Sequence, residues 1–455
     1  MDFIIGAVGF LIAITVLIAF HEFGHYWVAR RANIKILRFA IGFGKAIYSR
    51  KFGSDKSEFI IGSVPLGGYV KMLDEREGAV SPGDVDRAFN RQSLGVRSLV
   101  VAAGPIANFI LAFLLYILVF MVGSFERRVI VGEMEPQGAA MNAGLQKGDE
   151  IYAVEGRAVQ GVRQTMLAII EVALDSSRVA IEVVAADGER RQHTLEIDNE
   201  AFINDESRPA FEKLGMTLMR PELEAVVGDV LTDSAAQRYG LMQNDRILRF
   251  DGLPIENWSQ LTEQIRTHPD TPVELTILRD GREMAINFRP DAQTQGENVI
   301  GKAGIVVLSS PSLFEPYQVH IRYGLFDSIV KAAQQTWTMT ILTFKFIGHM
   351  ITGSVSLSNI SGPVTIAEVA GVSFLLGIVS YLSVLAIISI SIGVLNLLPV
   401  PVLDGGHLLH YLWEFIAGKP LSMVAQARAQ LVGMVMIGSL IVLALYNDVQ
   451  RLFGS

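Results

Sequence analysis

The sequence predicts a polytopic α-helical membrane protein with four transmembrane helices and two extracytoplasmic β-rich domains between the second and third helices. Three observations favour this fold class. Half of the 455 residues are hydrophobic and only 18% are charged, so the chain is more apolar than an average soluble domain. Four apolar stretches contain no charged residue. A polar segment with an internal repeat separates them into two pairs.

The four apolar stretches are residues 3–20, 99–122, 371–403 and 431–447. Each is close to or longer than the roughly 20 residues with which a helix crosses a bilayer. We expect the third to lose its helical form near its end. The first could be a secretory signal peptide, but it follows Asp2 rather than basic residues, and no small-residue cleavage site comes after it. We therefore expect it to remain as a transmembrane helix.

The distribution of basic residues predicts the orientation in the membrane. Residues 30–97 hold thirteen Lys or Arg, and four of them follow the first stretch closely. Loops rich in Lys and Arg stay in the cytoplasm, so this loop is expected inside and the N-terminus outside. Counting spans then places residues 123–370 outside, the loop 402–428 inside and the C-terminus outside.

Composition also excludes some classes of site and partner. The chain has no cysteine, so it can form neither a disulfide framework nor a thiolate metal site. Its net charge is −8 and its charges are mixed in sign. A nucleic-acid partner is not expected, because such proteins usually present a clustered basic face.

The polar segment contains an internal repeat. Residues 130–159 and 226–255 match without a gap at an offset of 96, with nine identities in thirty positions. Each copy predicts a strand, a short helix, a second strand and a turn. A longer helix (163–174; 258–267) and a strand that ends at an Asp-Gly turn follow.

The runs GAAMNAGLQKGDEIYAVEG and SAAQRYGLMQNDRILRFDG resemble PDZ domains. This resemblance implies two circularly permuted PDZ domains, at 126–220 and 222–310. PDZ domains add an extended peptide to a sheet edge beside a loop of backbone amides. The candidate loops carry Leu214 and Gly215 in the first copy and Gly304 in the second. The alternative is a β-rich spacer that binds nothing.

After the second copy, Tyr323 to Met350 is apolar and aromatic but is interrupted by Lys331, Lys345 and His349. That pattern is typical of an interfacial helix rather than a fifth span. Residues 322–370 are therefore expected to form an extracytoplasmic amphipathic helix and a loop.

The five residues HEFGH carry the strongest signal for chemistry. On a helix, His21 and His25 lie one turn apart on one face and can bind one metal ion together. Imidazole suits Zn²⁺, and Glu22 is the candidate general base. Histidines on an apolar face are usually satisfied core residues. Here, however, three ionisable side chains lie at the end of an uncharged span. Placing each of them in a membrane costs free energy, so their presence there indicates a functional role.

Asp404 is the candidate third ligand, because it is the only carboxylate between Gly371 and Glu414. Pro399 and Pro401 preclude a regular helix before it, and an unwound segment inside a membrane is tolerated beside a polar site. Alternatively, Asp404 caps the helix that follows. His407 and His410 are weaker alternative ligands.

HEFGH in a first span, NLLPVPVLDGG (396–406) in a penultimate span and PDZ-like repeats between them resemble the site-2 protease family. The resemblance covers nearly the whole chain. It implies that His21, His25 and Asp404 bind Zn²⁺ and that Glu22 is the catalytic base. It also implies that Asn396 holds the substrate backbone or the developing oxyanion, as amide donors can.

The same resemblance implies an intramembrane zinc endopeptidase of the bacterial inner membrane, with both termini and the PDZ domains periplasmic. Its substrates would be single-span membrane proteins, such as anti-sigma factors or remnant signal peptides, already trimmed by a first protease. The alternative is a PDZ-bearing membrane scaffold or chaperone without proteolytic activity. A metal transporter is disfavoured, because the spans carry only one ligand cluster.

Two glycine-containing segments complete the candidate site. The resemblance implies a membrane-associated β-loop around Gly42, Phe43 and Gly44 that binds substrate, although an ordinary cytoplasmic hairpin also suits these residues. Gly104, Pro105 and Asn108 either line the site or pack helices together. In chain order, the sequence predicts transmembrane helix 1 at 1–31, a cytoplasmic region at 32–96 and transmembrane helix 2 at 97–124. It then predicts PDZ domains at 126–220 and 222–310, the extracytoplasmic helix and loop at 322–370, transmembrane helix 3 at 371–404 and transmembrane helix 4 at 426–448.

Overall fold

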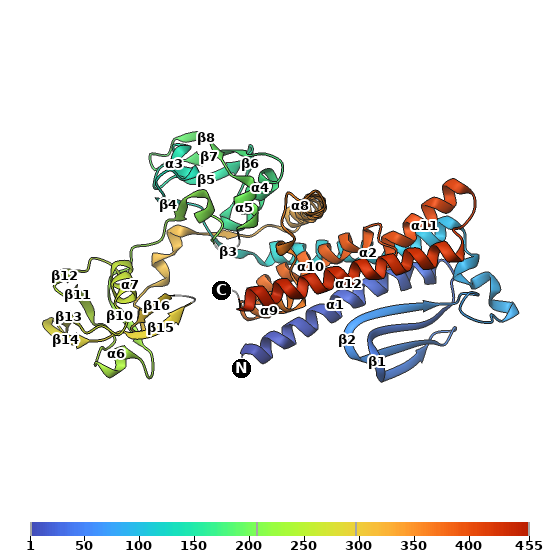
Figure 1. Cartoon of the computed structure of the whole chain (residues 1–455), viewed down its shortest axis with the longest axis horizontal. Coiled ribbons are helices and arrows are strands. Elements are labelled where there is room, and N and C mark those ends of the chain that lie inside the picture. The colour runs from blue at the N-terminus through green and yellow to red at the C-terminus, as the bar shows by residue number, and fades with distance from the viewer. Residues whose placement is uncertain (1, 206–207, 296–297, 454–455) are drawn as a thin grey trace. The chain divides into compact units, whose positions relative to one another are not determined.

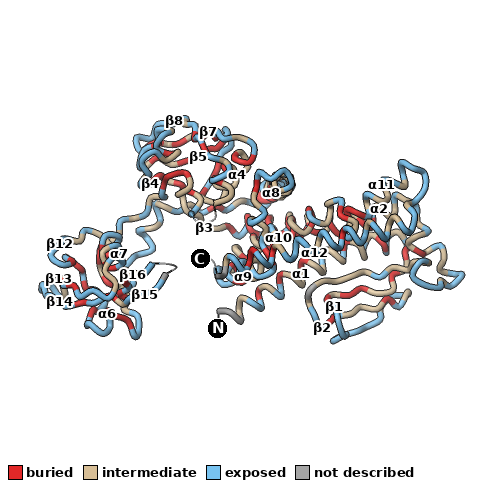
Figure 2. The backbone as a smooth tube through the Cα atoms, viewed as in Figure 1, coloured by how far each residue is buried: buried red, intermediate tan, exposed pale blue. Residues whose placement is uncertain are grey.

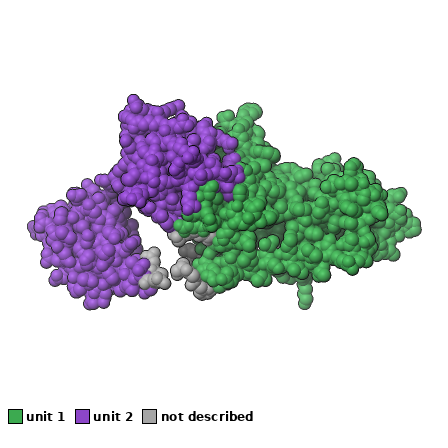
Figure 3. All heavy atoms as spheres, turned by 45° about the horizontal axis from the view of Figure 1, so that its top comes forward, with its two compact units in different colours: residues 1–124, 199–206, 320–454 green, residues 125–198, 207–319, 455 purple. Residues whose placement is uncertain are grey.

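A computed structural model describes residues 2–205, 208–295 and 298–453 (Figure 1). The chain forms two compact units (Figure 3). The first is mainly helical and consists of residues 1–124, 199–206 and 320–454. The second is rich in strands and consists mainly of residues 125–198 and 207–319.

Four helices are long and apolar enough to cross a membrane, as predicted: α1 (Asp2–Arg31), α2 (Leu94–Val122), α10 (Ile378–Leu397) and α12 (Met423–Phe453). Their most apolar windows have mean hydropathies of 2.0 to 2.5. Large apolar side chains are exposed along α12, which Figure 2 draws mostly in pale blue; Leu431, Val432 and Val442 are examples. Such a surface is costly in water and suits contact with lipid.

The structure divides the predicted third span differently from the expectation of one element over 371–404. A shorter helix, α9 (Pro363–Leu375), comes first, and α10 begins only after a break. Gly377 forms this break with a φ of 110°, which glycine adopts without steric cost. Hydropathy alone did not reveal it, because both sides of the break are apolar. Residues 398–403 are non-helical, and α11 (Asp404–Ala417) follows.

Helix α8 (Leu325–Thr352) has 28 residues and packs against α2 and α10. It is not among the four apolar helices that could span a membrane. α9 occupies part of the region after α8 that was expected to be a loop, and it contacts α1. A Cβ added to Gly6 of α1 would lie 3.4 Å from the Cα of Gly371 in α9, so two glycines permit this close crossing.

The loop between α1 and α2 forms a bent sheet of β1 (Ile36–Phe52) and β2 (Ser57–Met72). Residues 68–72 pair with 36–41, which pair in turn with 58–61, and these pair with the end of β1. Segment 68–72 therefore has one paired side and forms an edge of the sheet. Gly42 and Gly44 have φ angles of 85° and 86°, which let β1 bend between its two halves.

The β-rich unit contains two copies of one arrangement. In each, a four-stranded antiparallel sheet accompanies one longer helix, α4 (Gly161–Ala173) or α7 (Trp258–Thr267). The first sheet comprises β5 (Glu150–Val154), β6 (Arg157–Ala158), β7 (Arg178–Val184) and β8 (Arg190–Glu196). The second comprises β11 (Arg246–Phe250), β12 (Leu253–Pro254), β13 (Val273–Arg279) and β14 (Arg282–Phe288).

In each copy, a late strand pairs with an early strand of the same copy. β9 (Met216–Leu218) pairs with β4 (Val131–Met134), and β17 (Ile305–Val307) pairs with β10 (Val227–Val230). Gly215 and Gly304, with φ of 72° and 75°, precede these late strands. Their carbonyls accept equivalent bonds, from the Glu135 amide at 2.8 Å and the Leu231 amide at 2.9 Å. The two copies thus share their backbone connections as well as their sequence pattern.

An ion pair in the second copy yields a stability prediction. Asp245 is fully buried, and Arg279 donates to its two carboxylate oxygens at 2.7 and 2.6 Å. Replacing Arg279 with Ala would remove the counter-ion of a buried carboxylate and leave the Met242 amide as a donor to it, so we expect this copy to lose about 3–5 kcal/mol of stability. Hydrogen–deuterium exchange of β11 and β13 in the full chain measures the loss. Arg282→Ala, at an exposed position, is the control, and equal protection in both variants would contradict the prediction.

Candidate metal centre

Helix α1 and the start of α11 bring three potential ligands together. His21 and His25 lie one helical turn apart in α1, and their ring centroids are 4.9 Å from each other. Asp404 is the first residue of α11 and follows the non-helical residues 398–403. Among the described residues these three form the one group suited to hold a metal ion.

The distances between the three ligand atoms suit zinc. His21 Nε2 lies 3.3 Å from His25 Nε2, and Asp404 Oδ2 lies 3.2 Å from the first and 3.5 Å from the second. Ligand atoms about 2.0–2.1 Å from a tetrahedral Zn²⁺ are roughly 3.3 Å apart. The three atoms therefore occupy positions close to three corners of such a tetrahedron.

The hydrogen bonding around these atoms also suits a metal. His25 Nδ1 lies 2.8 Å from the Val100 carbonyl oxygen, which can only accept, so Nδ1 carries the proton and Nε2 keeps its lone pair. Asp404 Oδ2 is buried without a hydrogen-bond partner among the described residues. A buried carboxylate oxygen in that state is expected to have a cation beside it. The residues present fit Zn²⁺.

Two glycines allow α1 and α2 to approach closely enough for these contacts. A Cβ added to Gly24 would lie 2.2 Å from the Ala103 carbonyl oxygen. One added to Gly104 would lie 2.3 Å from His25 Nε2 and 2.8 Å from His21 Cε1. Gly104 thus packs directly against both imidazoles.

A cavity of about 590 Å³ opens onto the three ligands. Glu22 and Asn396 line it together with His21, His25 and Asp404. The Glu22 side chain lies against the sheet, since a Cβ on Gly68 would be 3.0 Å from its Cγ. The cavity therefore joins the candidate ligands, the candidate base and the candidate amide donor in one space.

The edge segment of β2 lines this cavity through Gly68, Tyr69, Val70, Lys71 and Met72. Gly42, Phe43 and Gly44, expected to bind substrate, are not among the lining residues. They form the bend of β1, and the half-exposed Phe43 ring stacks on Tyr69 at 6.4 Å. Their expected role in binding substrate stays a prediction.

The remaining predicted residues differ in where they lie relative to this cavity. Leu214, Gly215 and Gly304 belong to the β-rich unit and do not line this cavity. His407 and His410, the alternative ligands, line the cavity but are not part of the metal-binding group. Asn108, fully buried in α2, places its Nδ2 atom 3.1 Å from His21 Nδ1.

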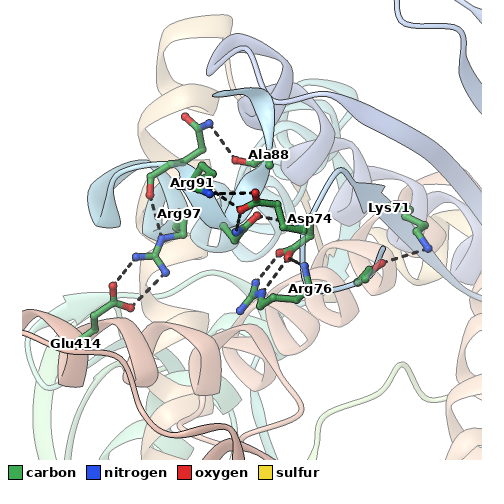
Figure 4. Close-up of polar contacts among 11 residues, drawn as sticks. Lys71, Asp74, Arg76, Ala88, Arg91, Arg97 and Glu414 are labelled. Atoms are coloured by element: carbon green, nitrogen blue, oxygen red, sulfur yellow. Dashed lines mark hydrogen bonds and ion pairs between the residues drawn. The ribbon is translucent and has the colours of Figure 1, made fainter. Parts of the chain in front are cut away.

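Several residues that line the cavity form ion pairs with one another (Figure 4). The Arg97 guanidinium, near the start of α2, donates to both carboxylate oxygens of Glu414 in α11, at 2.6 and 3.3 Å, and lies over the Tyr411 ring at 5.0 Å. This contact ties the helix that carries Asp404 to α2. Sequence reasoning missed Arg97 and Glu414, because nothing in their local sequence marks two residues 317 positions apart as partners.

The loop before α2 adds further charged residues to the cavity lining. Arg76 donates to both oxygens of Asp74, at 2.9 and 2.6 Å. Burial acts to raise the pKa of Asp74, but the hydrogen bonds from Arg76 outweigh it and hold this pKa below its ordinary value. Charged side chains are therefore part of the cavity lining.

Known proteins are similar to this chain along nearly its whole length. The chain is 39% identical to the regulator of sigma-E protease of Escherichia coli over 454 residues, covering 99% of this chain and all of that protein. It is equally similar to the regulator of sigma-E protease of Salmonella typhimurium, over 97% of this chain and 98% of that protein. A putative zinc metalloprotease of Neisseria meningitidis is 40% identical over 98% of this chain and 99% of its own length.

The family model for peptidase family M50 matches residues 9–440, which is nearly the whole chain. The match spans both halves of the metal centre, from the HEFGH segment to Asp404. The chain therefore belongs to peptidase family M50, the site-2 proteases, and is a zinc metalloendopeptidase of the intramembrane type.

Proposed function

We propose that His21, His25 and Asp404 hold the zinc ion and that Glu22 transfers protons during peptide hydrolysis. The observation that carries this assignment is the spacing of the three ligand atoms, 3.2 to 3.5 Å, inside the cavity that Glu22 also lines. Bound zinc supplies Lewis-acid chemistry, polarising the peptide carbonyl and activating water. Glu22 accepts a proton from the attacking water and delivers it to the departing amide nitrogen.

Asn396 and the sheet edge position the substrate in this proposal. Asn396, in the last turn of α10, lines the cavity and can donate its amide hydrogens to the substrate backbone or to the developing oxyanion. A transmembrane helix keeps its amides paired internally, so it must unwind before it is cut. Segment 68–72 offers a strand edge in the cavity lining that pairs with no other strand of the described residues on its outer side, and an unwound segment can add there as a further strand.

The substrates are single-span membrane proteins of the anti-sigma-factor or remnant-signal-peptide type, shortened beforehand by another protease. The names of the two regulators of sigma-E protease support this class. The protein lies in the bacterial inner membrane, with both termini and the β-rich unit on the periplasmic side. The cluster of basic residues between α1 and α2 supports that orientation.

The two β-rich copies are PDZ domains that exclude substrates with bulky outer domains or dock the trimmed end. Support comes from their matching backbone connections and from the late strands β9 and β17, each at the edge of a two-stranded sheet. Such an edge beside Gly215 or Gly304 is where an extended peptide would add. This assignment concerns access to the site and leaves its chemistry unchanged.

Co-expression with one single-span substrate in two forms tests the proposal. We expect the form with a truncated outer domain to be cut inside its membrane segment and the form with an intact outer domain to be spared. Deleting residues 126–310 should allow cleavage of both forms, because the filter is gone. Equal cleavage of the two forms by the natural chain would refute the filter. Absence of cleavage of either form by any variant would refute the substrate class.

A further inference from the structure

Asn108 occupies a position that the proteolytic chemistry described above does not use. It lies on the face of α2 that packs against the HEFGH segment, one turn after Gly104 and two turns after Val100. Its side chain is fully buried, and its backbone carbonyl accepts a 2.8 Å bond from the Ser389 hydroxyl of α10. A buried amide between transmembrane helices is costly unless its polar atoms have partners.

The partners of the Asn108 amide are unusual. Its Nδ2 atom lies 3.1 Å from His21 Nδ1, while its Oδ1 atom is buried without a hydrogen-bond partner among the described residues. If Nδ2 donates to Nδ1, the His21 proton must lie on Nε2, and Nε2 then has no lone pair for a metal. That tautomer conflicts with the proposed role of His21 Nε2 as a zinc ligand beside Asp404 Oδ2 and His25 Nε2.

Exchanging the oxygen and nitrogen of the amide removes the conflict. Amide orientations are assigned from hydrogen bonding, so both orientations fit the same shape. In the exchanged orientation Oδ1 accepts a hydrogen bond from His21 Nδ1, and Nε2 keeps its lone pair. His25 has an equivalent partner, because its Nδ1 lies 2.8 Å from the Val100 carbonyl oxygen.

We propose that Asn108 is a positioning residue that accepts a hydrogen bond from His21 Nδ1 and so fixes the tautomer in which His21 binds zinc. One stripe of α2 then orients both histidines: Val100 holds His25, Asn108 holds His21, and Gly104 leaves room for the two rings. Partners of this kind typically contribute 10- to 100-fold to metal affinity. The inference rests on the proposed role of His21 as a ligand.

Three substitutions test this role through zinc affinity, measured on the purified full-length chain by competition with chelators of graded strength. Asn108→Leu keeps the approximate shape but cannot accept a bond, so we expect about 10- to 100-fold weaker binding. In Asn108→Asp the carboxylate form can only accept, and we expect its affinity to stay within about threefold of the natural chain or to rise. Asn108→Ala repeats the loss with a smaller side chain, should the Leu variant fail to fold.

The pattern across the variants separates orientation from packing. Cobalt bound in place of zinc should keep its natural absorption spectrum in the Asp variant and change it in the Leu and Ala variants. Equal weakening of the Asp and Ala variants, or natural affinity in the Ala variant, would overturn the inference. His21→Ala tests the assignment of His21 as a ligand separately from the role of Asn108. If it keeps full zinc affinity, the ligand assignment itself fails, whereas failure of the Asn108 pattern alone leaves that assignment intact.

Discussion

Replacing Glu22 with Gln is expected to reduce peptide cleavage by at least about 100- to 10,000-fold, the usual contribution of general acid–base catalysis. Glutamine has nearly the same shape, but it cannot accept the proton of the attacking water or return one to the amide nitrogen. Glu22 lines the cavity of the three ligands and is not one of them. The variant should therefore still bind one zinc ion per chain while its activity is lost.

Fragment formation from a trimmed single-span substrate, together with the zinc content of the same preparation, measures this result. Glu77→Gln is the matched control. Glu77 also lines the cavity, but its carboxylate is mostly exposed and pairs with Lys71 at 3.2 Å. Near-natural cleavage by the Glu77 variant would show that a general loss of negative charge in the cavity is not the cause. Near-natural cleavage by the Glu22 variant would refute the assigned base.

The three candidate ligands could be identified from the sequence because the two histidines follow a local pattern and the carboxylate is a rare residue type in its region. The i, i+4 spacing places His21 and His25 on one face of any helix, whatever surrounds it. Asp404 stood out as the one carboxylate in a long apolar region, and the prolines before it indicated an unwound segment. The structure places one potential ligand atom of each of these three side chains within 4.8 Å of the others.

Other parts of the site depend on tertiary approach and left no local signal. Gly68 and Gly104 carry no functional group, and they matter only because Glu22 and the two imidazoles lie where a Cβ would be. The sheet edge at 68–72 depends on how β1 bends, which alternating apolar residues do not specify. The late start of α10 depends on one glycine conformation inside a continuous apolar run.

Gly104→Ala is the second substitution with a large expected effect, and it has two opposing physical consequences. Within a helix, replacing Gly with Ala is ordinarily stabilising by roughly 0.5–1 kcal/mol. Here the added methyl group would lie 2.3 Å from His25 Nε2, a proposed ligand atom, and 2.8 Å from His21 Cε1. Because both rings must move away, we expect zinc affinity to fall by more than the roughly 100-fold cost of a lost outer hydrogen bond.

Zinc content after dialysis and cleavage of a trimmed substrate should therefore both be lost in Gly104→Ala, while the helical circular dichroism of the chain persists. Gly95→Ala is the control in the same helix, because a Cβ there meets nothing within 4 Å. Retained zinc affinity and cleavage in the Gly104 variant would mean that the rings do not bind metal in the positions described. A loss confined to Gly104 would tie zinc binding to the close contact between α1 and α2, since Gly95 shares the helix and lacks the imidazoles as neighbours.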